Sequence, residues 1–142
     1  AQSLADAWRS ALGLQVTARA VTAEELAAAL GDGTFSLAGT EVRALGNDAE
    51  CFLLQWASTS QENVSRYANS AYDTLLSVIA GAEDETARLG CLHDAEALLL
   101  EEGAVAPLYT TVTAWTLRDS LTGLVRDGRG WFSFAGVVAR EA

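Results

Sequence analysis

Few side chains in this sequence have the types and spacing that enzyme chemistry requires. His93 is the only histidine, so no histidine cluster can form. It stands in the middle of a predicted helix, where we expect it to be exposed or satisfied by a neighbour and not to serve as a base. The sequence has no Gly-x-Ser-x-Gly nucleophile turn and no glycine-rich phosphate loop with a lysine. We therefore expect no catalytic residue, no cofactor and no enzymatic activity.

Acidic residues and cysteines do not suggest a metal site either. The acidic run 83–85 falls at the expected start of a helix, where carboxylates interact favourably with the helix dipole. Glu101 and Glu102 fall at a helix end, where we expect them to be solvated. Cys51 and Cys91 could form one disulfide, but we expect two buried free thiols because each lies among apolar residues of a predicted helix. We expect no metal ligand.

The composition is that of a globular protein with an acidic surface. Half of the 142 residues are apolar and 20% are charged, which is typical of a folded domain and not of disorder. The formal net charge of −10 repels nucleic-acid phosphates and anionic lipid headgroups. No apolar run reaches the roughly 18 residues that a membrane-spanning helix needs. We expect no nucleic-acid partner, and any export signal would lie upstream of Ala1.

Apolar residues recur at helical spacing in five segments, with caps at several of their ends. The predicted helices are 3–12, 22–30, 47–56, 70–80 and 84–102. Thr22 and Glu25 form the pattern of a capping box at the start of the second helix. The polar stretch 58–69 is predicted to be a loop.

Other segments have the patterns of strands. Residues 14–21 alternate between apolar and polar, as in a half-buried strand, and 34–45 is a second candidate that Gly39 weakens. Further strands are predicted at 104–113, 115–118 and 131–138, with a turn-rich stretch at 119–130. The order of elements predicts an α/β fold with a mixed sheet flanked by helices, in one domain that spans 1–142. The apolar content is sufficient for the core of one such domain.

Several segments, taken in order, resemble the motifs of one protein family. These are Trp-Arg-Ser-Ala-Leu-Gly-Leu-Gln-Val at 8–16, Gly-Thr-Phe at 33–35, Asp-Ala-Glu-Cys-Phe-Leu at 48–53, Asn63 with Tyr-Ala-Asn-Ser-Ala-Tyr-Asp-Thr-Leu-Leu at 67–76, Arg88, Ala95-Glu96, Pro-Leu-Tyr at 107–109 and Leu-Thr-Gly at 121–123. Their order and spacing are similar to those of the peptide-class (oligopeptide, dipeptide and nickel) extracellular solute-binding proteins of bacterial ABC transporters. The resemblance covers nearly the whole chain.

The resemblance implies a fold, a location and partners. It implies part of the C-terminal lobe of a longer, two-lobed periplasmic-binding-protein-like receptor, which holds a peptide or a related small solute between its lobes. Such a receptor delivers its ligand to ABC permease subunits at the extracellular face of the membrane or in the periplasm. It touches the membrane only through a lipid anchor, which would lie outside this chain.

The segment that corresponds to the family's cleft-facing strand departs from the family pattern of Trp-x-x-Asp-Tyr-x-Asp-Pro. Val42 stands where the family has an aromatic residue, and Leu45 stands where oligopeptide binders place the carboxylate that pairs with the peptide's amino terminus. Glu41 shares a strand face with Leu45 and could substitute as the acid. The candidate ligand contacts are Glu41, Val42, Arg43, Leu45 and Asn47. These departures keep a second function open, namely an interaction or signalling module that has kept the fold and lost the peptide-amine site.

Overall fold

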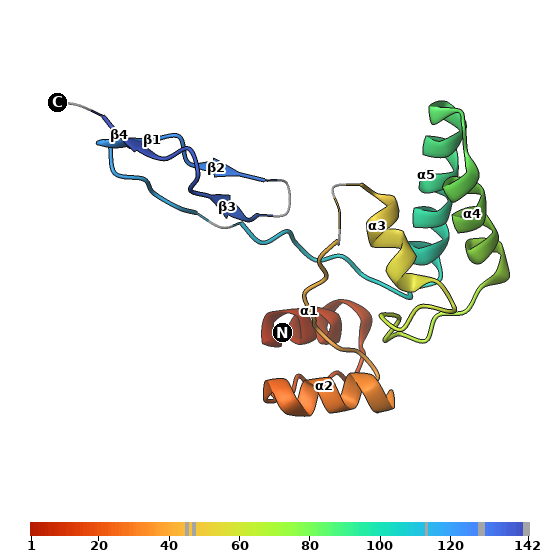
Figure 1. Cartoon of the computed structure of the whole chain (residues 1–142). Helices are drawn as coiled ribbons and strands as arrows, with labels where there is room; N and C mark the ends of the chain where they lie inside the picture. Colours follow the sequence, from red (N-terminus) through yellow and green to blue (C-terminus); the bar gives the residue numbers. More distant parts are fainter. Residues whose placement is uncertain (45, 47, 113, 128–129, 141–142) are drawn as a thin grey trace. The chain divides into compact units, whose positions relative to one another are not determined.

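The computed structural model describes residues 1–44, 46, 48–112, 114–127 and 130–140 (Figure 1). The chain divides into two compact units, Ala1–Glu41 and Val42–Ala142, and each is described here by itself.

The first unit contains two capped helices joined by a segment without regular structure. Helix α1 spans Gln2–Leu12 and ends at Gly13, which takes the left-handed conformation with a φ of 68° that favours glycine. Helix α2 spans Ala23–Asp32 and begins with the predicted capping box. The Thr22 hydroxyl accepts from the Glu25 amide at 3.2 Å, and the Glu25 carboxylate accepts from the Thr22 amide at 2.9 Å.

The two strands predicted beside these helices are not present. Residues 14–21 and the described residues of 34–45 have no strand pairing. Apolar alternation gives a strand one buried face, but a strand also needs a neighbour for its backbone hydrogen bonds. In the described part of this unit no such neighbour exists, and Leu14 and Leu37 remain exposed.

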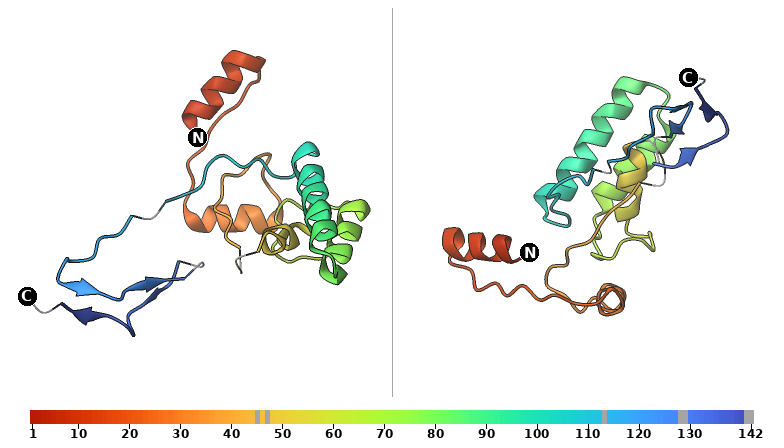
Figure 2. Two further views of the ribbon diagram at one scale, coloured as in Figure 1. Left: turned by 90° about the horizontal axis from the view of Figure 1, so that it is seen from above. Right: turned by 90° about the vertical axis from the view of Figure 1, so that its left-hand side faces the viewer.

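The second unit begins with a helical part, which holds its core. Helix α3 (Glu50–Leu53) continues as the short 3-10 helix η1 (Leu54–Trp56), and α4 (Ser70–Gly81) packs beside α5 (Glu85–Glu101) in every view (Figures 1 and 2). All three helices predicted in this region are confirmed. Their caps are local: Asn69 accepts from the Ala71 and Tyr72 amides, and Asp84 accepts from the Ala87 amide.

Among the described residues of the second unit, the buried ones all come from these helices. They are Leu53, Trp56, Tyr72, Leu76, Ile79, Leu92, Ala95 and Leu99. Among the described residues of the first unit only Ala5 is buried, and none is buried among those from 104 to 140. The apolar content of the sequence therefore overstated the core, because most apolar residues outside α3, α4 and α5 stay at least partly exposed. Trp131 is 74% exposed.

The C-terminal part of the second unit is an interrupted hairpin. Strand β1 (Leu121–Thr122) pairs antiparallel with β4 (Val138–Ala139), and β2 (Val125–Arg126) pairs antiparallel with β3 (Phe132–Ser133). Gly123 and Leu124 stand opposite four residues, 134–137, so the register shifts between the two pairs. At Gly123, with a φ of 85°, a Cβ would lie 1.9 Å from the Gly136 oxygen, so only glycine fits.

This hairpin changes the predicted placement of strands but not the fold class. The stretch 119–130, predicted to be turns, contributes β1 and β2, whereas the described residues of 104–113 and 115–118 form no strand. The strand predicted at 131–138 is divided into β3 and β4 by a turn. Helices combined with small sheets agree with the predicted α/β class. No helix in the described part is long and apolar enough to cross a bilayer.

Candidate ligand-binding segment

The predicted ligand contacts lie in one stretch, residues 41–47, which we call the ligand segment. Glu41 and Arg43 are exposed, and Val42 is half-buried against the helical core of the second unit. Leu45 and Asn47 lie outside the described residues, so their predicted roles stay predictions. Val42 therefore has a packing role that its place in the sequence motif did not suggest.

The side chain of Gln55 holds the backbone of the ligand segment. Its amide nitrogen Nε2 donates to the Arg43 carbonyl at 3.2 Å and to the Cys51 carbonyl at 3.0 Å. One amide thus joins the helix α3–η1 to the extended backbone that precedes it. The hydrogen bond to the Cys51 carbonyl is partly buried, whereas the one to the Arg43 carbonyl is exposed.

A charged cluster marks the point where the ligand segment meets α3. Arg88 of α5 pairs through Nη2 with Asp48 Oδ1 at 2.7 Å and Glu50 Oε2 at 3.1 Å, and through Nη1 with Glu85 Oε1 at 3.7 Å. Asp48 Oδ1 also accepts from the Glu50 amide at 2.9 Å. The hydrogen bond from Arg88, and then that amide, lower the pKa of Asp48, so this carboxyl stays ionised and paired.

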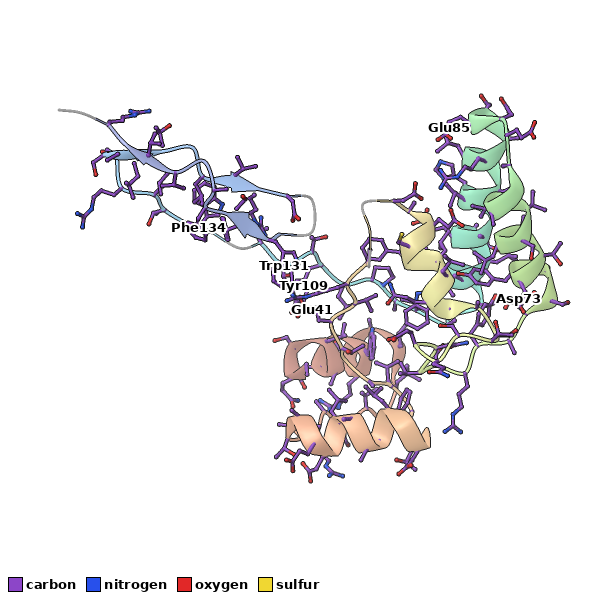
Figure 3. All side chains as sticks on the ribbon, viewed as in Figure 1. Glu41, Asp73, Glu85, Tyr109, Trp131 and Phe134 are labelled. Carbon is purple, nitrogen blue, oxygen red and sulfur yellow. The ribbon has the colours of Figure 1, made fainter. Side chains whose placement is uncertain are left out.

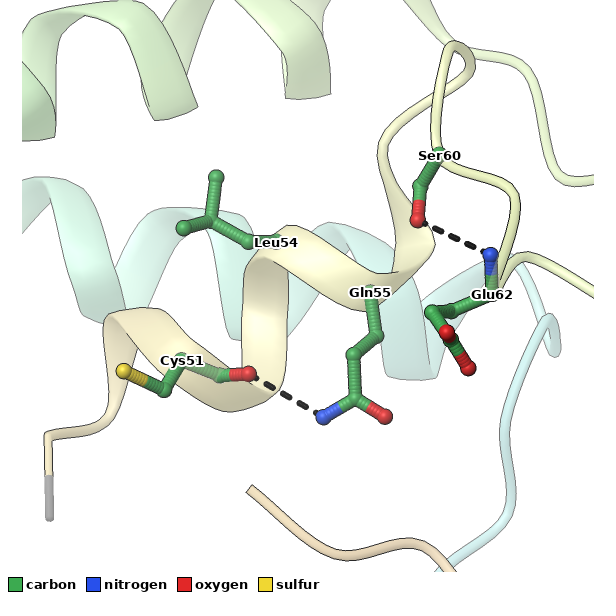
Figure 4. A pocket seen from close by; sticks show the side chains of 5 residues that line it. All are labelled: Cys51, Leu54, Gln55, Ser60 and Glu62. Carbon is green, nitrogen blue, oxygen red and sulfur yellow. Dashed lines mark hydrogen bonds between the residues drawn. The ribbon is translucent and has the colours of Figure 1, made fainter. Parts of the chain in front are cut away.

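A small pocket of about 210 Å³ lies beside α3 and η1 (Figure 4). It is lined by Cys51, Leu54, Gln55, Ser60 and Glu62. A Cβ at Gly46 would lie 2.9 Å from the Cys51 sulfur, so a side chain at this position would have to displace the thiol. Cys51 and Cys91 are both free thiols, as expected, but they are half-buried and not fully buried.

Asn63 organises the loop between η1 and α4. Its side-chain nitrogen donates to the carbonyls of Trp56, Ala57 and Tyr67 at 3.3, 3.1 and 2.7 Å. Its side-chain oxygen accepts from the Ser65 hydroxyl at 2.9 Å and the Tyr67 amide at 3.1 Å. The sequon-like Asn-Val-Ser therefore has a structural role in this loop.

The remaining motif residues around α4 also build the scaffold. Asn69 caps α4 and donates to both carboxylate oxygens of Glu102 at 2.8 and 3.0 Å, which joins the start of α4 to the end of α5. Asp73, in the first turn of α4 (Figure 3), accepts from the Ser58 amide at 3.0 Å and the Ser58 hydroxyl at 2.5 Å. Each contact joins residues far apart in the sequence, and none involves the ligand segment.

Tyr67 and Tyr72, which both belong to the motif at 67–76, pack edge to face with their ring centroids 5.3 Å apart. The hydroxyl of the buried Tyr72 donates to the Leu53 carbonyl at 2.7 Å. Burial, and second the Glu102 carboxylate, raise the pKa of Tyr67 to about 12. Its hydroxyl has no hydrogen bond of good geometry among the described residues, so we attribute the effect of Glu102 to its charge. Burial also raises the pKa of Tyr72.

These shifts predict a loss of stability in alkali. The folded chain holds its phenolic protons more tightly than the unfolded chain, whose tyrosines titrate near pH 10. As the pH rises from about 10 to about 12 the unfolded chain loses protons first, so the free energy of unfolding must fall. The sequence has no lysine to titrate in this window. Urea titrations followed by circular dichroism should show a falling midpoint above about pH 10; a constant midpoint up to pH 12 would contradict the assignment.

Metal-ligating side chains do not converge in the described residues. No group of three metal-ligating side chains occurs there. Next to the ligand segment lie a backbone carbonyl held by Gln55, a paired acidic cluster and a small pocket.

Comparison with known proteins supports this class of function. No protein-family model matches the chain. The probable deoxycholate-binding periplasmic protein YgiS of Escherichia coli (strain K12) is 33% identical over 107 residues, which cover 75% of this chain and 20% of the relative. The periplasmic murein peptide-binding protein MppA of the same organism is 26% identical over 85% of this chain and 22% of the relative. The dipeptide-binding protein DppE of Bacillus subtilis (strain 168) is 29% identical over 59% of this chain and 16% of the relative.

Two solved structures resemble the chain in fold. The unliganded open form of MppA matches with a TM-score of 0.70 and 25% identity over 72% of this chain and 20% of that one. The pheromone receptor PrgZ matches with a TM-score of 0.77 over 99% of this chain and 27% of that one; its 23% identity supports the fold alone. The chain spans about a fifth of the length of the curated relatives that it matches. YgiS and MppA are named as periplasmic binding proteins and DppE as a dipeptide-binding protein, and the predicted resemblance of this chain to the peptide-binding class of ABC-transporter binding proteins is confirmed.

Proposed function

We propose that the chain is part of the second lobe of a peptide-class solute-binding protein. The whole protein would hold a peptide or a related small solute between two lobes and deliver it to ABC permease subunits. It would act in the periplasm or at the outer face of the membrane. The observation that carries the proposal is the similarity to MppA, which extends over 85% of the chain in sequence and appears again in fold.

The contacts of the motif residues support the same proposal. Asn69, Tyr72 and Asp73 fix the helical scaffold through hydrogen bonds between distant segments, and Asn63 holds the loop before α4 through local ones. A fold that retains its scaffold residues can present a different ligand contact from the same place, because ligand contacts belong to the exposed segment and not to the core.

The chemical class of the ligand is less restricted than the fold. Leucine at position 45 cannot neutralise an ammonium group, and a buried unpaired charge is strongly unfavourable. The relative YgiS is named for binding deoxycholate, a solute without a peptide amine. The ligand of this protein would therefore be a peptide bound without dependence on a free amino terminus, or a non-peptide solute. A module that has lost transport is the second candidate, and the replacement at Leu45 favours it.

The test compares a peptide that has a free amine with one that does not. In the full-length protein, isothermal titration with tri-alanine and N-acetyl-tri-alanine should give dissociation constants within about threefold of each other, or less than about 1 kcal/mol. Leu45→Asp should favour the free amine by tenfold or more, about 1.4 kcal/mol. The acid should produce this preference because it pairs with the ammonium group in a partly desolvated site.

Four other outcomes discriminate between the candidates. Acetylation that abolishes binding to the parent, with the dependence unchanged in Glu41→Gln, would show that another acid serves the amine. Loss of this dependence in Glu41→Gln would identify Glu41 as the substitute acid. Binding of neither peptide, with deoxycholate bound, would place the ligand outside the peptides; binding of none of the three would favour the non-transport module.

A further inference from the structure

The cluster around Arg88 lies at the end of the ligand segment and links it to a distant helix. Asp48 follows the segment directly, whereas Arg88 is forty positions further along, on α5. The Arg88 side chain is only 18% exposed, and its Nη2 lies within 3.1 Å of carboxylates on both sides of the α3 start. A partly desolvated guanidinium with two carboxylate partners holds its geometry better than an exposed pair does.

The cluster also determines the local charge beside the segment. Asp48, Glu50 and Glu85 are three carboxylates within reach of one guanidinium. Without that guanidinium, Asp48 and Glu50 would be two neighbouring negative charges, and each would attract a cation such as a ligand ammonium. With the guanidinium in place, the negative charges of Asp48 and Glu50 are balanced by their ion pairs with Arg88 of α5.

Three contacts among the described residues of the second unit hold the ligand segment and Asp48, the residue that follows it. Val42 packs on the core, the Arg43 carbonyl accepts from Gln55, and Asp48 pairs with Arg88. Of these three contacts only the last is charged, and it is the one whose loss would change both the position and the electrostatic potential of the segment.

We propose that Arg88 is a positioning residue for the ligand segment and that it keeps Asp48 and Glu50 from serving as an amine-binding acid pair. The proposal rests on the proposed function as far as it concerns a ligand. The positioning effect concerns the chain alone, so the two parts can fail separately.

The first test requires no ligand. In amide spectra of the 142-residue chain, Arg88→Met should shift the resonances of Ala44, Gly46 and Asp48 while those of the α4–α5 core persist. Asp48→Asn, which keeps an oxygen for the Glu50 amide, should shift the resonances of Ala44 and Gly46 even if Arg88→Met fails to fold. The matched control is Arg118→Met, since Arg118 is exposed. Segment resonances unchanged in both test variants would overturn the positioning role.

The second test measures specificity in the full-length protein. We expect Arg88→Met to increase the preference for tri-alanine over N-acetyl-tri-alanine by at least tenfold, because Asp48 and Glu50 are then unpaired. Adding Asp48→Asn and Glu50→Gln to this variant should return the ratio of the two dissociation constants to the wild-type value. If Arg88 had a purely structural role, Arg88→Met would weaken the binding of both peptides equally and leave the ratio of their dissociation constants unchanged. That result would overturn the specificity role. If the wild-type protein binds neither peptide, the proposed function fails for peptides and the specificity role fails with it, while the first test still decides positioning.

Discussion

Replacing Tyr72 with alanine is expected to unfold the helical part of the second unit. Tyr72 is fully buried, and its ring packs edge to face with Tyr67 in a core to which the described residues contribute eight buried side chains. Truncation of a buried aromatic side chain costs about 3–5 kcal/mol. Loss of the hydroxyl that donates to the Leu53 carbonyl adds about 1–3 kcal/mol if that carbonyl stays buried. The sum approaches the whole stability of a typical domain, about 5–15 kcal/mol.

Two variants separate the contributions of Tyr72. Tyr72→Phe removes only the hydroxyl, so the free energy of unfolding should fall by about 1–3 kcal/mol with the fold retained. Tyr109→Ala removes an aromatic ring that is 82% exposed, and should change stability by less than about 0.5 kcal/mol. Urea unfolding followed by far-ultraviolet circular dichroism measures all three. A cooperative transition in Tyr72→Ala at the wild-type midpoint would disprove the central role of this ring.

The helices could be predicted from the sequence because their determinants are local. The capping box at Thr22, the Asn69 and Asp84 caps and the apolar spacing of α4 and α5 all act within one or two turns. Because such a pattern involves only neighbouring residues, one short stretch of sequence contains all of it, and the helix can be predicted without knowledge of the fold.

The strands could not be placed because their determinants are not local. Residues 14–21 have strand alternation but no partner in the described part of the chain, whereas β1 and β2 lie in a stretch that has turn composition. Pairing of β1 with β4 depends on the close approach of Gly123 to Gly136, which no window of sequence around either residue indicates.

The candidate site could be predicted only in part from the sequence, because the contacts that hold it are not local either. The resemblance pointed to residues 41–47, yet the side chains that hold this segment, Gln55 and Arg88, came from elsewhere. Arg88 was noted as a motif residue, but its partners Asp48 and Glu50 are about forty positions away and became evident only in the fold. The reason is physical: ion pairs between distant segments leave no periodic signal in a single sequence.

Replacing Asn63 is expected to have the second largest effect on stability. One amide satisfies the carbonyls of Trp56, Ala57 and Tyr67 and accepts from the Ser65 hydroxyl and the Tyr67 amide. A hydrogen bond contributes about 0.5–1.5 kcal/mol net, and an unsatisfied buried partner costs more. Since water can replace some of the five contacts, we expect Asn63→Ala to lower the free energy of unfolding by roughly 2–4 kcal/mol.

The isosteric change Asn63→Asp tests whether hydrogen bonding or volume is responsible. Aspartate has the same shape, but its ionised carboxylate has no donor and would face the carbonyls that now accept from Nδ2. We therefore expect Asn63→Asp to destabilise at least as much as Asn63→Ala near pH 7, and to recover partly in acid when the carboxyl is protonated and can donate one hydrogen bond.

Urea unfolding and amide hydrogen exchange at Tyr67 should report the loss of these contacts together. The Tyr67 amide donates to Asn63 Oδ1 at 3.1 Å, so its protection should decrease most in Asn63→Ala, which removes this acceptor, whereas Asn63→Asp keeps it. Gln61→Ala in the same loop is the control, because Gln61 is exposed and a surface substitution usually changes stability by less than about 0.5 kcal/mol. If Asn63→Asp proves as stable as the wild type at neutral pH, the donors of this amide do not hold the loop, and the shape of the side chain alone must account for asparagine at this position.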